Sequence, residues 1–105
     1  MLEKINRMNE LFDAYESLLT AKQKLYFELY YQADLSLAEI AGQLEVSRNA
    51  VFDNIKRTEK VLENYEEKLS LVANRMAREQ LLEEIRQSVQ DEHVKGLIEQ
   101  LQDLE

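Results

Sequence analysis

The stretch of sequence that decides the fold is Ser36–Leu37–Ala38–Glu39–Ile40–Ala41–Gly42–Gln43–Leu44–Glu45–Val46–Ser47–Arg48–Asn49–Ala50–Val51. Ser36 followed three residues later by Glu39 forms a capping box, which predicts the start of a helix. The apolar positions that follow recur at steps of three and four, as one face of a helix requires, and they are Leu37, Ile40, Ala41 and Leu44. Ser47 is a further N-cap candidate shortly afterwards. The stretch therefore predicts two helices joined by a short turn.

The packing expected at this turn is that of a helix-turn-helix. Ala41 is small where the two helices cross, so their backbones can approach. We expect the corner to be filled by Ile40, Leu44, Val46, Val51 and Ile55. Ser47 caps the second helix and leaves its first turn facing outward, where Arg48 can donate to guanine and Asn49 can bind adenine. Phosphates suit the basic residues further along. The candidate nucleic-acid-binding residues are therefore Ser47, Arg48, Asn49, Lys56, Arg57 and Lys60.

The charge distribution singles out the same region. The whole chain carries a net charge of −8, which counts against broad, non-specific affinity for nucleic acid. Residues 47–60 contain four basic and two acidic side chains, whereas the segments 1–46 and 61–105 carry net charges of −4 and −6. A charge run is usually only a solvated helix face, so this block supports the interpretation without deciding it.

The rest of the chain is expected to be helical. It contains no proline and only two glycines, Gly42 and Gly96, so long helices cost little. Thr20 and Gln23 form another capping box. We predict an all-α helix-turn-helix bundle at residues 1–70, with a long C-terminal helical extension at 71–105. The predicted helices are 2–19, 21–33, 37–44 and 47–75, plus one or two after them. The aromatic cluster within 21–33 is expected to pack the core rather than stack on bases.

A long apolar seam follows the predicted turn. Its members alternate at steps of four and three, and they are Val51, Ile55, Thr58, Leu62, Tyr65, Leu69, Val72 and Met76. Such a seam suits either packing on the first helix of the same chain or pairing with a second subunit. Further apolar sets occur at Leu82, Ile85 and Val89, and then at Val94, Leu97, Leu101 and Leu104. Two paths are open at residues 74–78: the chain turns back there, or it only shifts its apolar face. We expect a homodimer that uses the seam or the amphipathic tail.

Composition argues against several kinds of site. There is no cysteine, and the one histidine, His93, has no second histidine to share a metal. No glycine-rich phosphate loop and no spaced Ser, His and Asp set occur. We therefore expect neither an enzyme nor a metal site nor a cofactor. No apolar run is long enough for a membrane span and no signal peptide opens the chain, so a cytoplasmic protein without membrane insertion is expected.

The central stretch resembles the helix-turn-helix of sigma-factor region 4, which commonly has S-L-x-E-I-A, a short spacer and then S-R. One departure concerns the turn, where the position usually held by glycine is Glu45. A left-handed conformation would cost a side-chain-bearing residue roughly 1 kcal/mol. We therefore expect this turn to differ slightly from the usual one.

A larger part of the chain resembles the YlxM-type family. The resemblance rests on Met8–Asn9, Leu18–Leu19–Thr20–Ala21–Lys22–Gln23, Leu29–Tyr30–Tyr31, Val46–Ser47–Arg48, Asp53–Asn54–Ile55–Lys56–Arg57–Thr58–Glu59 and Glu66–Glu67–Lys68–Leu69. It covers roughly the first two thirds of the chain. It implies a small bacterial protein. Its relatives tend to be encoded beside the signal recognition particle genes and are suspected regulators or accessory factors of that targeting pathway.

Two functional hypotheses follow. One is a DNA-binding regulator that uses Arg48 and Asn49, favoured by the local positive block. The other is an accessory protein that docks on the protein or RNA of the signal recognition particle, favoured by the net acidity, since an acidic body repels a phosphate backbone. A purely structural adaptor is a third possibility, because a helix-turn-helix also serves for protein contacts.

Overall fold

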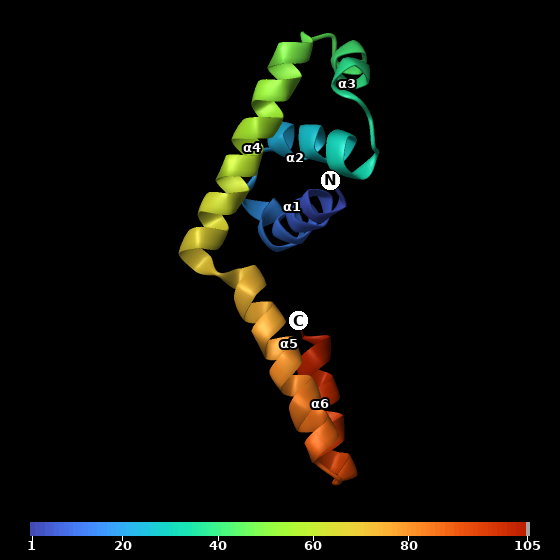
Figure 1. The fold of residues 1–105 in the computed structure, drawn as a ribbon, viewed down its shortest axis with the longest axis vertical. Coiled ribbons are helices and arrows are strands. Elements are labelled where there is room, and N and C mark those ends of the chain that lie inside the picture. The colour runs from blue at the N-terminus through green and yellow to red at the C-terminus, as the bar shows by residue number, and fades with distance from the viewer. Residues whose placement is uncertain (105) are drawn as a thin grey trace. The chain divides into compact units, whose positions relative to one another are not determined.

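The computed structural model describes residues 1–104, and over that range it contains helices and no β-strand (Figure 1). Its elements are α1 Leu2–Tyr15, η1 Glu16–Leu18, α2 Ala21–Phe27, η2 Glu28–Gln32, α3 Leu37–Leu44, α4 Arg48–Leu69, α5 Leu71–Ser88 and α6 Glu92–Asp103. The chain divides into two compact units, Met1–Leu69 and a second unit from Ser70 on. The all-α prediction is confirmed. None of the described helices is both long and apolar enough to cross a membrane.

The three predicted N-caps are confirmed. The Thr20 hydroxyl accepts from the backbone N–H of Gln23 at 3.1 Å, and the Gln23 side chain accepts from the backbone N–H of Thr20 at 2.9 Å. Ser36 and Glu39 form the same reciprocal pair at 3.1 and 3.0 Å. The Ser47 hydroxyl accepts a backbone N–H three residues further on at 3.0 Å. These local bonds satisfy backbone donors that would otherwise lack partners, and they fix where α2, α3 and α4 begin.

The ends of the first two helices differ from the prediction. The expected helix 2–19 is α-helical only to Tyr15 and then tightens into the 3-10 turn η1. The expected helix 21–33 is α-helical to Phe27 and then widens into the π-helical turn η2, in which the Ala33 N–H reaches the Glu28 carbonyl at 2.8 Å. Apolar spacing did not reveal either change, because one tight or wide turn leaves an amphipathic pattern nearly unaltered.

Aromatic side chains fill the space between α1 and α2. The rings of Phe12 and Phe27 stack with their centroids 4.3 Å apart and only 2° between their planes. Tyr26 and Phe27 are buried, so the core interpretation of this cluster is confirmed for them. The buried apolar side chains of the first unit are Met8, Leu11, Phe12, Tyr15, Leu19, Tyr26, Phe27, Ile40, Val51, Ile55 and Leu62.

Helix α4 is the central element of the first unit, and α1, α2 and α3 all contact it. Its inward face consists of the first members of the predicted seam. Val51, Ile55, Thr58 and Leu62 are each at most 3% exposed. The first half of the seam therefore packs within its own chain, as one of the two hypotheses expected.

The predicted continuous helix 47–75 is wrong at its C-terminal end. Helix α4 ends at Leu69, and Ser70 takes a left-handed conformation with φ of 53° before α5 begins. Met76, the last predicted seam member, is 53% exposed. The spacing concealed this break, because a single left-handed residue does not interrupt the alternation of steps. No proline or glycine marks the position in the sequence.

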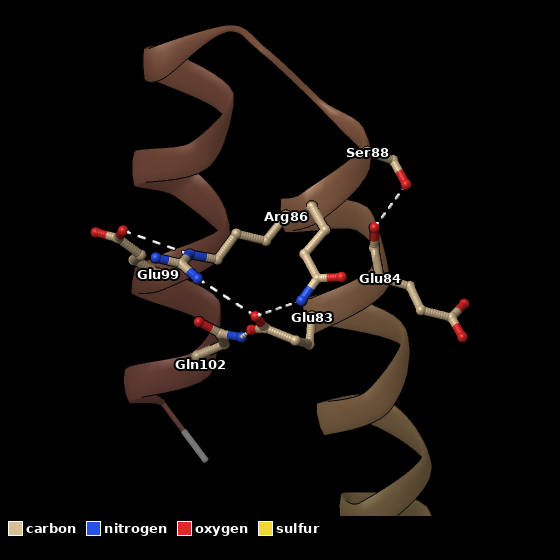
Figure 2. A network of polar contacts seen from close by, with 7 residues as sticks. Glu83, Glu84, Arg86, Ser88, Glu99 and Gln102 are labelled. Carbon is tan, nitrogen blue, oxygen red and sulfur yellow. Dashed lines mark hydrogen bonds and ion pairs between the residues drawn. The ribbon is translucent and has the colours of Figure 1, made fainter.

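The second unit contains α5 and α6, which contact each other and are joined by residues 89–91. The chain therefore turns back after Ser88 and not near 74–78. Asp91 caps α6 by accepting the N–H of His93 at 2.8 Å. One side of the hairpin carries a polar network, shown in Figure 2. In it Gln102 donates to Glu83 at 3.2 Å, and Arg86 bridges to Glu83 at 3.3 Å.

These contacts affect the acidity of one carboxyl group. The hydrogen bond from Gln102, followed by the positive charge of Arg86, lowers the pKa of Glu83 below its ordinary value. Arg86 also lies 3.7 Å from a carboxylate oxygen of Glu99 on α6. The polar contacts therefore join α5 and α6 along one side of the hairpin. The buried Ile98 of α6 adds apolar contact to the hairpin.

Candidate nucleic-acid interface

The turn between α3 and α4 is built around Glu45. This residue takes the left-handed conformation with φ 56° and ψ 45°, although it is not glycine. The backbone N–H of the next residue, Val46, bonds to the carbonyl of Ala41 at 3.1 Å, which satisfies a carbonyl at the end of α3. The expected deviation of the turn is therefore not found at this residue. The strain, roughly 1 kcal/mol, is retained in the fold.

The corner between the two helices is packed largely as expected. Ile40, Val51 and Ile55 are at most 3% exposed and form one cluster with Tyr26. Leu44 of the predicted corner and Ala41 at the predicted helix crossing are partly buried against it. The prediction is wrong for Val46, which is 38% exposed. Val46 directly follows the left-handed residue, and the reversal of the chain there leaves its side chain outside the corner.

The first turn of α4 presents its polar side chains to solvent. Ser47 caps the helix, and Arg48 and Asn49 after it are both exposed. One and two turns further along, Val51 and Ile55 are buried and fix the rotation of the helix. Arg48 forms no ion pair with any described residue. Its guanidinium is therefore available to a ligand approaching this turn.

The three further basic candidates are exposed but not equivalent. Arg57 and Lys60 have no ion-pair partner among residues 1–104. Lys56 differs, since its ammonium lies 3.4 Å from a carboxylate oxygen of Glu59. Its positive charge is thus partly compensated inside the protein. Arg57 and Lys60 are the better phosphate-binding candidates.

Glu59 gathers donors from three elements. Its side chain is almost fully buried, and it accepts a hydrogen bond from the Tyr31 hydroxyl of η2. Lys4 of α1 and Lys56 of α4 both approach the other carboxylate oxygen at 3.4 Å. Burial, together with the hydrogen bond and negative charge of Glu59, raises the pKa of Tyr31. The cluster ties α1 and η2 to the middle of α4, and sequence reasoning did not foresee it.

Sequence reasoning also missed Phe52 on the exposed side of α4. Its side chain is 44% exposed, and the ammonium of Lys56 lies 5.6 Å from the centroid of its ring. Phe52 follows Arg48 by four residues and Asn49 by three, so the three share one face of the helix. The signal was present, because burial of Val51 already turns its neighbour outward. Asp53 is exposed beside it and adds a negative charge to this region.

These features define a class of protein. A helical bundle in which α3, a left-handed turn and a capped α4 form one corner around a shared apolar cluster is a helix-turn-helix fold.

The comparison with known proteins agrees. Residues 2–104 match the family UPF0122, described as "Putative helix-turn-helix protein, YlxM / p13 like". A UPF0122 protein of Bacillus pumilus is 56% identical over 108 residues, covering 99% of this chain and 98% of the relative. A UPF0122 protein of Listeria welshimeri is 51% identical over 110 residues and covers 100% of both chains. The UPF0122 protein YofM of Lactococcus lactis subsp. lactis is 64% identical over 84 residues, covering 80% of this chain and 76% of the relative. The chain belongs to the UPF0122 family.

Proposed function

We propose that this protein is a non-catalytic regulator that binds duplex DNA through the first turn of α4. One observation carries the proposal: Arg48 and Asn49 are exposed on the capped first turn of a helix whose rotation is fixed by the buried Val51. A guanidinium can bond in bidentate fashion to guanine and a side-chain amide to adenine, and both base edges lie in the major groove. The fixed orientation of the helix favours such contacts, because the helix itself loses little freedom on binding.

In this proposal the remaining basic residues position the protein on the phosphate backbone. Arg57 and Lys60 lie about two and a half and about three and a third turns further along α4 than Arg48 and carry uncompensated charge. Such contacts contribute affinity without reading sequence. Lys56 contributes less, since Glu59 holds its ammonium at 3.4 Å.

The test is fluorescence anisotropy against duplexes selected from a random pool, at two salt concentrations. The double variant Arg48→Ala with Asn49→Ala should lose roughly 1–3 kcal/mol for each bidentate base contact removed. Its melting temperature should barely change, since exposed substitutions usually alter stability by no more than about 0.5 kcal/mol. Arg57→Ala should weaken all duplexes alike and flatten the salt dependence by about one ion. Equal binding by the wild type and the double variant would refute the base contacts.

A second candidate function is supported by a different observation. The chain carries a net charge of −8, and the acidic residues outnumber the basic ones both before and after the segment 47–60. An acidic body disfavours phosphate and suits a basic protein surface. In this alternative the protein is an accessory factor of the signal recognition particle pathway and docks on the protein or RNA of that particle. Capture from lysate after treatment with DNase, with RNase or with neither separates the cases, because DNase removes a contact through DNA, RNase removes a contact through RNA, and a direct protein contact survives both.

We further propose that the protein forms a homodimer through the second unit. Leu81, Ile85, Leu97 and Leu101 are each about half exposed, and we call them the apolar hairpin face. Helical spacing places them on the side of the hairpin opposite to Glu83, Arg86, Glu99 and Gln102. A two-helix hairpin that buries so little of its apolar surface is marginal alone.

A second copy suits this face better than a charged partner does. The cross-helix carboxylates Glu83 and Glu99 lie on the polar side, so two acidic chains could approach through the apolar side without facing their own carboxylates. A two-fold axis would then pair the same face with itself. Dimers of helix-turn-helix proteins present two recognition helices to two half-sites, which agrees with the proposed DNA binding.

A further inference from the structure

An exposed aromatic ring is unexpected in the middle of a polar recognition surface. Phe52 is 44% exposed, whereas its neighbour Val51 is fully buried, so the ring belongs to the outer face of α4 and not to the corner. It lies one turn after Arg48 and Asn49 and one turn before Lys56, in line with the proposed base-reading residues. The exposed part of the ring has no hydrogen-bonding group, so the contact that it can add to a ligand is an apolar one.

The major groove offers one prominent apolar group, the C5 methyl of thymine. We propose that Phe52 is a specificity-determining residue that packs against a thymine methyl group, next to the bases contacted by Arg48 and Asn49. This inference rests on the proposed DNA binding and deepens it. It names a base that the N-terminal part of α4 selects. It also favours DNA over RNA, because uracil lacks the methyl group and the deep, narrow major groove of A-form RNA does not admit side chains.

The Glu59 cluster supports the position of the ring. The Lys56 ammonium lies 5.6 Å from the ring centroid of Phe52 and 3.4 Å from the Glu59 carboxylate. The Lys56 ammonium and the face of the Phe52 ring attract each other, and the buried Glu59 carboxylate holds that ammonium in place. Lys56 is therefore a positioning residue for Phe52 as well as a weak phosphate contact. The outer edge of the ring remains free to meet a methyl group.

The experiment removes only the methyl group. Wild-type protein first selects duplexes from a random thymine-containing pool, and each thymine of the enriched duplex is then replaced singly by deoxyuridine. Anisotropy is measured for both forms. At one position the wild type should bind the deoxyuridine duplex about fourfold more weakly, as burial of one methyl-sized group predicts. Phe52→Ala should bind the two forms equally, and Phe52→Leu should retain part of the difference.

The matched control is Leu25→Ala on α2, since Leu25 is 43% exposed and lies outside the recognition face. It should retain the full preference for thymine. The Phe52 and Leu25 variants are first checked for an unchanged melting temperature, and Lys56→Met, which removes a cation beside Glu59, is checked for being folded at the assay temperature. Lys56→Met should reduce the thymine preference in part, because the ring loses its cation, whereas a residue that only bound phosphate would weaken both duplexes equally.

Four outcomes would overturn the inference. If the wild type binds every deoxyuridine duplex as tightly as the thymine duplex, no methyl group is read. If Phe52→Ala keeps the preference, another residue reads the methyl group. If the wild type binds no duplex above background, the proposed DNA binding fails as a whole. This result differs from a failure of the methyl contact alone, in which the wild type still binds both the thymine and the deoxyuridine duplex. Specific capture of a protein through Phe52, without duplex binding, would assign this face to that protein and likewise overturn the inference.

Discussion

At the scale of single residues, the buried carboxylate of Glu59 controls how the outer face of α4 is charged. An ionised carboxylate needs compensation when it leaves water, and Glu59 obtains it from the Tyr31 hydroxyl and two ammonium groups. The same contacts reduce the free positive charge of Lys56. As a result, the positive block seen in the sequence is concentrated at Arg48, Arg57 and Lys60 in the folded protein.

The first prediction concerns pH. The raised pKa of Tyr31 means that the folded protein holds this proton more strongly than the unfolded chain, whose tyrosine ionises near the ordinary value of 10.0. The contribution is fully present below pH 10 and is lost as the pH rises above it. Because Tyr31 is only partly buried, the loss should stay below the roughly 1.4 kcal/mol per pH unit of one fully suppressed ionisation.

Urea unfolding between pH 9 and 11 checks this prediction. The free energy of unfolding of Tyr31→Phe should be lower than that of the wild type at pH 9, since Glu59 loses a donor, and it should decline less steeply above pH 10. The matched control is Tyr30→Phe, because Tyr30 neighbours Tyr31 but is not the donor to Glu59. Parallel curves for wild type and Tyr31→Phe would contradict the assignment.

Around the turn, the sequence predicted the exposure of those side chains whose direction is set by the spacing within a single helix. The Ser47 cap and the seam that begins at Val51 together fixed Arg48 and Asn49 as outward, and the structure agrees. The Glu59 cluster was out of reach, because Lys4 and Tyr31 come from distant segments and meet only in the folded chain. Sequence spacing carries no information on such meetings.

At the scale of elements, local signals determined where helices begin better than where they end. Thr20, Ser36 and Ser47 act on the next few N–H groups, so their effect is readable from neighbouring residues. The end of α4 depends on a left-handed Ser70 without any glycine or proline, and the sequence offers no counterpart of a cap for it. Helix ends that carry no such local signal are therefore the boundaries that were missed.

The next prediction concerns the strained turn. Glu45→Gly should stabilise the first unit by up to about 1 kcal/mol, since glycine adopts the left-handed conformation without the clash of a Cβ. The gain is limited because glycine also makes the unfolded chain more flexible. Glu45→Gln removes the charge but keeps the Cβ, so it is the matched control and should leave stability nearly unchanged.

The opposite substitution at Gly42 tests the same physics. Gly42 lies inside α3, has no positive φ, and a Cβ built there meets nothing within 4 Å. Gly42→Ala should therefore stabilise the helix by roughly 0.5–1 kcal/mol. Chemical denaturation measures both variants. A loss of stability in Glu45→Gly would show that the Glu45 side chain makes a contribution larger than its strain.

At the scale of the whole molecule, the two units differ in how much apolar surface they bury. The first unit buries an extensive core around α4 and presents the proposed DNA-binding face. The second unit buries few apolar side chains and leaves the apolar hairpin face half exposed. The amphipathic sets that form this face were visible in the sequence. Their arrangement as a hairpin was not, because the turn at residues 89–91 contains no glycine or proline.

The last prediction follows from that imbalance. If the apolar hairpin face pairs two chains, sedimentation equilibrium at micromolar concentration should give about twice the chain mass of 12.4 kDa. Ile85→Asp with Leu101→Asp should yield a monomer, since the paired face would have to bury carboxylates without partners. Asn64→Asp, an exposed position of α4 in the first unit, adds a charge away from the face and should remain dimeric. If the dimer also serves DNA binding, the monomeric variant should bind a single half-site with unchanged affinity but lose the extra affinity of a palindromic site, because only a dimer engages both halves at once. A wild type that sediments as a monomer at every concentration, or a double aspartate variant that stays dimeric, would contradict the assignment of this face.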